Sequence, residues 1–255
     1  MPAAPGFVAP HNVIDALQKD ERPMKKTPRK ASAPAAAPGE PPLRLAMPKG
    51  RILEEAEVLF RRAGIDLAII RDRSRRLVHD IEGPDGPLRV YVVRDADVPT
   101  YVEYGAADLG IAGRDILEEQ GRDLYEPLDL GIGRCRLSVA EREGHPVDER
   151  GTLHLRIATK FPNLTRRHLE ARGVVADVIK LYGSIELGPL TGLADRIVDL
   201  VSTGETLRQN HLREVETIME VSARLVVNRA SLKLRRRAVD ALVGRLRAAL
   251  TDGAR

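Results

Sequence analysis

The hydrophobic and polar positions along the chain predict short strands that alternate with helices. Apolar runs over residues 43–47, 88–93 and 108–112 are typical of buried strands. Helical spacing of apolar residues follows over 52–63 and 98–104, and again from Ile116. Gly64 and Gly105 end the first two of these helices. This alternation indicates an α/β fold.

A second run of the same kind occupies the rest of the chain. Strands are predicted over 132–141, 155–159, 174–181 and 197–201, with a helix over 164–172. Residues 211–220 and 223–228 are predicted to be extended, and a last helix is expected over 232–250. One face of that helix is apolar, with Val239, Leu242, Val243, Leu246 and Leu250. The other face is expected to be exposed, with Arg235, Arg236, Asp240, Arg245 and Arg247.

Residues 1–42 have a different composition from the rest. They are rich in Pro and Ala, with a basic stretch from Lys25 to Lys30. Such a segment does not bury enough apolar surface to offset its ordering entropy, so we expect a disordered tail. It lacks the continuous apolar stretch of a secretory signal, and natural translation from Met24 is one hypothesis.

The overall composition is that of a soluble globular protein. Of 255 residues, 43% are hydrophobic and 31% charged, and no apolar run is long enough to span a membrane. The net charge of +4 does not by itself indicate nucleic acid, and 3% aromatics without Trp argue against stacking on single-stranded bases. Cys135 is the single cysteine, which excludes an internal disulfide and fits a reducing compartment. We therefore expect a cytoplasmic protein without nucleic-acid or membrane partners.

The stretch DLVSTGETL at 199–207 is the strongest candidate for a ligand site. An apolar run that carries Asp199 is followed by a loop rich in hydroxyls and glycine, and Leu207 then starts a helical pattern. A loop of this kind directs backbone N–H groups and side-chain donors to one point, which favours phosphate. Asp199 is placed to accept hydrogen bonds from sugar hydroxyls. The alternative is an ordinary strand–turn–helix junction capped by Ser or Thr.

Charged residues also follow the other predicted strands. Lys49 and Arg51 flank Gly50 directly after the first strand, and Arg94 and Asp115 follow later ones. Open α/β sheets bind ligands at the carboxyl ends of their strands, so Lys49 and Arg51 are candidates for a phosphate or pyrophosphate. A solvated basic turn and helix-capping carboxylates remain the alternatives at this point. No metal-ligand spacing, Walker loop or Gly-x-Ser-x-Gly motif is present.

Several of these stretches together resemble the ATP phosphoribosyltransferase family, the first enzymes of histidine biosynthesis. They occur in the family's order between Leu43 and about Leu250, as MPKGR at 47–51, RDADVPTYV at 94–102, GAADLGIAGRD at 105–115, IATKFPN at 157–163, GSIE at 183–186 and LADRIVDLVSTGETL at 193–207. The chain ends where longer members continue into an ACT-like domain, so it resembles the short form.

The resemblance implies a fold of two α/β lobes around a cleft, similar to periplasmic binding proteins of type II. Residues 43–137, to which 223–255 return, are expected to form lobe I, and 138–222 lobe II. The implied reaction joins N1 of ATP to C1 of phosphoribosyl pyrophosphate and releases pyrophosphate, with Mg²⁺ bound mostly by substrate oxygens. The implied partner is a histidyl-tRNA-synthetase-like regulatory subunit, with a homodimer alone and a hetero-octamer in the complex.

The family's roles carry over to matching positions of this chain. The 5-phosphate would bind to Ser202, Thr203, Gly204 and Thr206. Asp199 would hold the ribose hydroxyls, with Glu186 as a second candidate. The phosphates of pyrophosphate or ATP would face Lys49, Arg51 and Arg94, and Asp115 would lie on the nucleotide side. Asp199, Lys49 and Arg51 are the expected catalytic residues, and no protein-held metal is expected.

Two other functions remain as alternatives. A solute-binding module with the same fold would not need the phosphate loop at 202–206. A different phosphoribosyltransferase usually carries two adjacent acids before its loop, whereas Val198 precedes Asp199 here.

Overall fold

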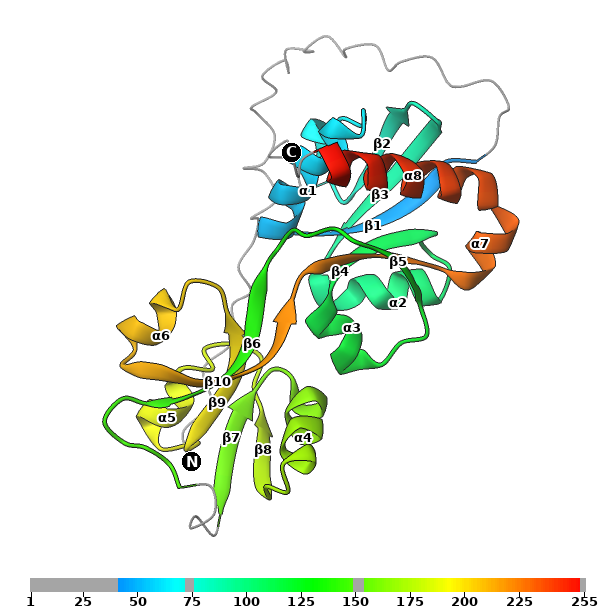
Figure 1. The fold of residues 1–255 in the computed structure, drawn as a ribbon. Coiled ribbons are helices and arrows are strands. Elements are labelled where there is room, and N and C mark those ends of the chain that lie inside the picture. The colour runs from blue at the N-terminus through cyan, green and yellow to red at the C-terminus, as the bar shows by residue number, and fades with distance from the viewer. Residues whose placement is uncertain (1–40, 72–75, 149–153, 253–255) are drawn as a thin grey trace, which may run out of the picture. The chain divides into compact units, whose positions relative to one another are not determined.

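A computed structural model of the chain describes residues 41–71, 76–148 and 154–252 (Figure 1). The tail expected over 1–42 lies outside the described residues except for Pro41 and Pro42. No helix in the described ranges is both long and apolar enough to cross a membrane.

The first sheet has six strands in the order β2-β3-β1-β4-β11-β5. They are β1 (Leu43–Pro48), β2 (Val78–Gly83), β3 (Gly86–Val93), β4 (Leu109–Gly113), β5 (Tyr125–Asp129) and β11 (Ala223–Val227). β1 pairs in parallel with β3 and β4, whereas β2 and β11 run antiparallel to their neighbours. The central strands β1 and β4 are buried on both faces, as their near-continuous apolar sequences require.

Helices cover both faces of this sheet (Figure 1). Side chains alternate along each strand, so one strand contributes side chains to the cores on both faces. From β1, Leu45 and Met47 enter the larger core, to which α1 (Arg51–Arg62) and α8 (Arg236–Asp252) contribute. Ala46 instead joins a smaller cluster with α2 (Val98–Glu103) and α3 (Arg114–Gln120). The 3-10 helices η1 (Ala68–Arg71) and η2 (Asp95–Asp97) follow α1 and β3.

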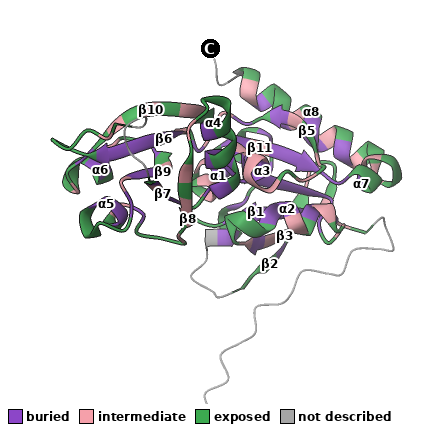
Figure 2. Ribbon diagram, turned by 90° about the horizontal axis from the view of Figure 1, so that it is seen from below, coloured by how far each residue is buried: buried purple, intermediate pink, exposed green. Residues whose placement is uncertain are grey.

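The second sheet has five strands in the order β10-β6-β9-β7-β8. They are β6 (Cys135–Arg142), β7 (Leu155–Thr159), β8 (Ala176–Lys180), β9 (Arg196–Val201) and β10 (Leu212–Val221). β7 pairs in parallel with β8 and β9, and β6 is antiparallel to both β9 and β10. Buried residues run along β6 and β9 in Figure 2.

Helices also lie on both faces of the second sheet. α4 (Pro162–Ala171) shares an apolar cluster with Val198 of β9. Ile197 and Val201 of β9 point the other way, into the cluster that includes Leu207 of α6 (Glu205–Gln209). α5 (Leu187–Thr191) packs near β9. Each sheet with its helices is one lobe, so the expected α/β fold of two lobes is confirmed.

The last helix was predicted incorrectly in two respects. Residues 232–250 are not one helix, because α7 (Arg229–Leu234) and α8 are separated at Arg235, whose φ is −127°. Arg235 is also not on an exposed face. Its side chain is 17% exposed and turns inward to the carbonyl oxygens of Pro41 and Pro42 and to Asp108.

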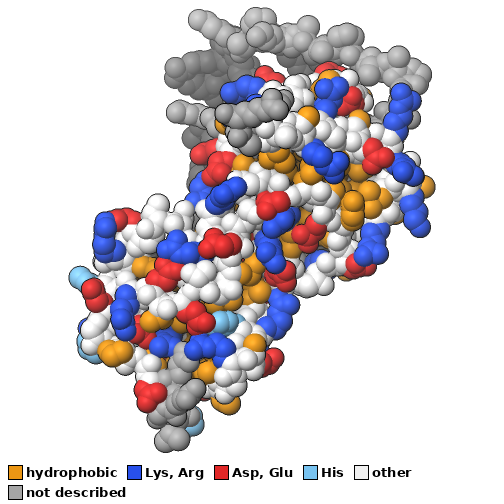
Figure 3. Space-filling view, in the orientation of Figure 1, with side chains coloured by type: hydrophobic (Ala, Val, Ile, Leu, Met, Phe, Trp, Pro, Cys, Tyr) orange, Lys and Arg blue, Asp and Glu red, His pale blue; other side chains and the backbone are white. Residues whose placement is uncertain are grey.

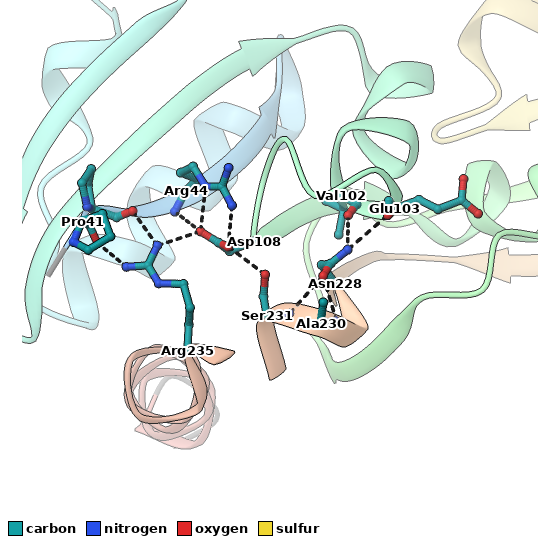
Figure 4. A network of polar contacts seen from close by, with 10 residues as sticks. Pro41, Arg44, Val102, Glu103, Asp108, Asn228, Ala230, Ser231 and Arg235 are labelled. Atoms are coloured by element: carbon teal, nitrogen blue, oxygen red, sulfur yellow. Dashed lines mark hydrogen bonds and ion pairs between the residues drawn. The ribbon is translucent and has the colours of Figure 1, made fainter. Parts of the chain in front are cut away.

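Asp108 is the centre of the polar network that holds these distant segments together (Figure 4). Its fully buried carboxylate accepts hydrogen bonds from the Arg44 backbone and guanidinium, the Ser231 hydroxyl and Arg235. Asn228 caps α7 by accepting from the backbone N–H groups of Ala230 and Ser231, at 2.9 and 3.0 Å. The network therefore fixes the start of β1 and the α7–α8 junction against β4.

The strands β2 and β5 and the helix α5 were not predicted from the sequence. β2 and β5 are the edge strands of the first sheet, and each has more exposed than buried residues. Their apolar patterns are therefore weaker than those of the central strands. α5 has only five residues, too few for a helical repeat to be visible.

Candidate active site

The loop after β9 forms a small cavity in the second lobe. Its volume is about 150 Å³, and six predicted site residues line it, namely Glu186, Asp199, Ser202, Thr203, Gly204 and Thr206. Gly204 has a φ of +78°, a left-handed conformation that is strained for side chains other than glycine. The glycine thus permits the sharp turn that brings the loop residues together before α6 begins at Glu205.

Asp199 lies within β9, two residues before the end of the strand rather than at its last residue. Its Oδ1 accepts a hydrogen bond of 2.9 Å from the Leu200 backbone N–H. Burial raises the pKa of Asp199, and the nearby Glu186 carboxylate also raises it, whereas the Leu200 N–H and Lys160 oppose the rise. Two carboxylates in one cavity with few internal donors are suited to accept hydrogen bonds from hydroxyl groups of a ligand.

Arg51 joins the first lobe to this loop. From the first turn of α1, its Nη1 donates to the Ser202 hydroxyl at 2.9 Å, and its Nη2 lies 3.4 Å from the Gly133 carbonyl oxygen. Cys135 lies beside it, and burial raises the pKa of the thiol, which Asp115 reinforces and Arg51 opposes. The half-buried Cys135 thiol is therefore harder to ionise than that of a free cysteine.

Lys49 and Arg94 line neither this small cavity nor the larger one described in the next paragraph. Pro48 and Val93 are register partners and are the last residues of β1 and β3. Lys49 and Arg94 follow them directly, so both lie at the carboxyl ends of these parallel strands. Both side chains are exposed, and neither makes a hydrogen bond or ion pair within the described residues. The structure thus places these two cations at the carboxyl ends of neighbouring strands, but it does not bring them into contact with the loop at 202–206.

A larger cavity of about 510 Å³ lies between the two lobes. The first lobe supplies Asp95, Ala96, Asp115, Ile116, Glu119, Gln120 and Arg122, and the second supplies Lys160, Phe161, Asn163, Lys180, Leu181, Tyr182 and Leu200. Leu200 also lines the small cavity, so the two adjoin. Burial raises the pKa of Asp115 to about 6, with a smaller contribution from Asp95 and an opposing one from Lys160.

The role of Lys160 in this cavity was not predicted. Lys160 directly follows the strand predicted over 155–159, just as Lys49 closely follows the first predicted strand. A lysine in that position was the signal, and it was not used. Tyr182, which stacks under the Lys180 ammonium at 5.4 Å, was likewise assigned only to a loop.

No metal cluster or basic patch dominates the described surface. Within the described residues, no group of three or more His, Cys, Asp or Glu side chains is arranged to hold a metal. On the face in Figure 3, Lys and Arg side chains are interspersed with Asp and Glu over both lobes.

Comparisons with known proteins show the family of this chain. Residues 94–248 match the family model of ATP phosphoribosyltransferase (HisG). An ATP phosphoribosyltransferase of Acidithiobacillus ferrooxidans is 55% identical over 210 residues, which is 81% of this chain and 97% of the relative.

Solved structures give the same result. The ATP phosphoribosyl transferase (HisG:HisZ) complex from Thermotoga maritima contains a chain of 34% identity and TM-score 0.71, with 84% of this chain and 100% of that chain covered. A substrate-binding protein of an amino acid ABC transporter has a TM-score of 0.54 at 12% identity, over 83% of this chain and 94% of its own. This second likeness confirms the expected similarity to periplasmic binding proteins in fold alone. The chain belongs to the ATP phosphoribosyltransferase family.

Proposed function

We propose that the two adjoining cavities are the active site in which this chain performs the reaction of its family. In that reaction, N1 of ATP attacks C1 of phosphoribosyl pyrophosphate, which gives phosphoribosyl-ATP and pyrophosphate in the first step of histidine biosynthesis. The observation that carries the proposal is the small cavity, which is lined by six predicted residues from β9, the loop before α6, the start of α6 and the N-cap position of α5.

The small cavity is the proposed seat of the ribose 5-phosphate. Backbone N–H groups around Gly204 and the hydroxyls of Ser202, Thr203 and Thr206 are suitable donors for a phosphate. Asp199 and Glu186 lie in the same cavity, where their carboxylates would accept hydrogen bonds from the ribose 2- and 3-hydroxyls. Both ends of the sugar are thereby fixed, which orients C1 for attack.

Cations of the first lobe are proposed to bind phosphates. Arg51 already reaches Ser202 of the loop, so its guanidinium is positioned for the 5-phosphate or the pyrophosphate. Lys49 and Arg94 lie at one edge of the first sheet without partners among the described side chains, and we assign them to the pyrophosphate or ATP phosphates. As C1 becomes oxocarbenium-like, positive charge near the departing pyrophosphate stabilises the transition state.

The larger cavity is the proposed nucleotide site. Its volume of about 510 Å³ is in the range of small-molecule sites, and this cavity adjoins the small cavity at Leu200. Asp115 would accept a hydrogen bond from the nucleotide there. No general base is required, because the N1 lone pair of adenine is itself the nucleophile.

We propose Mg²⁺ as the accompanying ion. Mg²⁺ is usually bound through one or two carboxylates together with substrate phosphates and water, and Asp199 and Glu186 supply two carboxylates in the small cavity. When bound, the ion would neutralise part of the pyrophosphate charge. The residues present are therefore compatible with a substrate-bound metal.

We also propose a regulatory partner and a domain organisation. The solved Thermotoga maritima relative is a HisG:HisZ complex, and this chain spans nearly all of the relatives it matches, so we propose that it works with a synthetase-like subunit in a hetero-octamer and forms a homodimer alone. Lobe I would comprise 43–134 and 223–255, because β6 of the second sheet already begins at Cys135. We propose a cytoplasmic location for the complex.

The test is turnover of ATP and phosphoribosyl pyrophosphate with Mg²⁺, measured with and without the regulatory subunit. Asp199→Ala is expected to lower kcat/KM by about 100-fold or more, because it removes an interaction with the reacting sugar. Asp177→Ala is the matched control, since Asp177 is an exposed aspartate on β8 of the same sheet. Binding of phosphoribosyl pyrophosphate without turnover in either setting would indicate a solute-binding module instead.

A further inference from the structure

We infer that Lys160 is a further substrate-binding residue of this site, and that its ammonium binds the pyrophosphate group of phosphoribosyl pyrophosphate where the two cavities adjoin. The inference rests on the proposed function and adds a residue and a subsite to it.

The strand register places Lys160 beside Asp199. β7 and β9 are parallel, and their pairing ends with Thr159 opposite Val198. Lys160 is the first residue after β7, and Asp199 is the next residue along β9. The Thr159 hydroxyl locks this end of the sheet. It donates to the Val198 carbonyl oxygen at 2.7 Å and accepts from the Phe161 N–H at 2.9 Å. Lys160 therefore leaves the sheet at a fixed point next to the proposed ribose carboxylate.

The turn that carries Lys160 is also fixed at its other end, by the first lobe. Both oxygens of the Glu119 carboxylate accept from the Asn163 N–H at 3.0 Å, and one also accepts from the Leu164 N–H at 2.9 Å. Asn163 donates in return from its side-chain amide to the Glu119 carbonyl oxygen at 3.0 Å. Residues 160–163 are thus held between β7 and α3.

The Lys160 ammonium is available for a ligand. It lines the larger cavity and makes no hydrogen bond or ion pair within the described part of the chain. It is nevertheless close enough to oppose the burial-driven rise in the pKa of Asp115 in one lobe and of Asp199 in the other. The Lys160 ammonium therefore lies between the Asp199 carboxylate, proposed to hold the ribose, and the larger cavity, proposed to hold ATP.

The leaving group is the substrate part that best fits this position. The small cavity, proposed to hold the 5-phosphate, is lined by the loop and by Glu186 and Asp199. Lys160 is not among its lining residues. In the reaction the adenine N1 lone pair forms the bond to C1, and the electron pair of the C1–O bond leaves with pyrophosphate. Lys160 keeps its proton throughout, and its charge offsets the negative charge that grows on the departing oxygen.

The test compares Lys160→Met, Lys160→Arg and the control Lys233→Met with the wild-type chain. Lys233 is an exposed lysine on α7, away from both cavities. Lys160→Met is expected to lower kcat/KM for phosphoribosyl pyrophosphate by about 10- to 100-fold, the usual effect of losing a charged hydrogen bond. Calorimetric titration with Mg²⁺-pyrophosphate should show a similar loss of affinity, whereas ribose 5-phosphate should bind nearly as before. Lys160→Arg, which keeps the charge, should recover part of both effects.

Several outcomes overturn the inference and leave the proposed function intact. The inference is wrong if Lys160→Met binds pyrophosphate with the same affinity as the wild type, even if its turnover falls. A change confined to KM for ATP would also overturn it, because Lys160 would then serve the nucleotide. Absence of turnover and of pyrophosphate binding in the wild type would instead overturn the proposed function itself. Thermal unfolding of each variant ensures that only folded protein is compared.

Discussion

Asp115 is a side chain whose ionisation is strongly affected by its surroundings. It is 4% exposed, and burial raises its pKa to about 6 from 3.8, against the attraction of Lys160. The folded state therefore binds more protons than the unfolded state between these two values. Stability consequently falls as the pH rises through this interval, and by pH 8 the buried charge costs about 3 kcal/mol.

Asp115→Asn is expected to remove this pH dependence. The uncharged amide keeps the shape of the side chain, so the variant should be more stable than the wild type, and its advantage should grow by about 1 kcal/mol between pH 5 and pH 8. Urea unfolding at the two pH values measures this difference. Asp177→Asn, at an exposed position, should show no such growth. An advantage of equal size at both pH values would show that burial of the charge is not the cause.

At the scale of elements, the Asp108 network determines how the C-terminal helices attach to the first sheet. Burial by itself raises the pKa of Asp108, but hydrogen bonds from Arg44 and Ser231 outweigh it, and the pKa is lowered. The stability that these contacts give is therefore present above the ordinary pKa of an aspartate and is lost as the pH falls.

Asp108→Ala is expected to destabilise the protein by about 3 kcal/mol or more, because Arg44 and Arg235 lose the charge that compensates their partial burial. The matched control is Asp80→Ala, whose exposed pair with Arg89 is screened by solvent and should contribute far less. Thermal and urea unfolding compare the two variants. Equal losses would mean that the buried network is no more important than a surface ion pair.

At the scale of the whole molecule, contacts between α3 and α4 join the two lobes beside the larger cavity. Glu119 takes the place of a capping side chain for α4, since Phe161 at the N-cap position supplies none. Glu118 also contributes, because its carbonyl oxygen accepts from Arg167 and its carboxylate forms an ion pair with Arg167 at 3.6 Å.

Glu119→Ala is expected to loosen this contact with little loss of global stability, about 1 kcal/mol. Hydrogen exchange at the Asn163 and Leu164 amides should accelerate, since both lose their acceptor. Glu118→Ala is the control, because its carboxylate makes only exposed ion pairs and those amides keep Glu119. Unchanged exchange at Asn163 and Leu164 in Glu119→Ala would show that the α3–α4 contact does not depend on this carboxylate.

Local sequence patterns predicted most of the fold and the loop of the candidate site. Central strands such as β1, β4 and β7 are buried on both faces and so have continuous apolar sequences. The residues of the DLVSTGETL loop are neighbours in the chain, so their meeting in one cavity required only a strand, a glycine turn and a helix start. Edge strands and short helices lack such patterns and were missed.

The sequence by itself therefore determined the α/β class, the family and the loop, because each depends on residues close together in the chain. Only the tertiary structure decided the contacts made over long separations. Arg235, where the last predicted helix is interrupted, donates to Asp108 across 127 residues, and Arg51 donates to Ser202 across 151. Lys160 faces Asp115 only because the β7 register and the Glu119 contact bring the lobes' residues together. Periodicity records which face of an element is apolar, but it does not record which distant charge that element will meet.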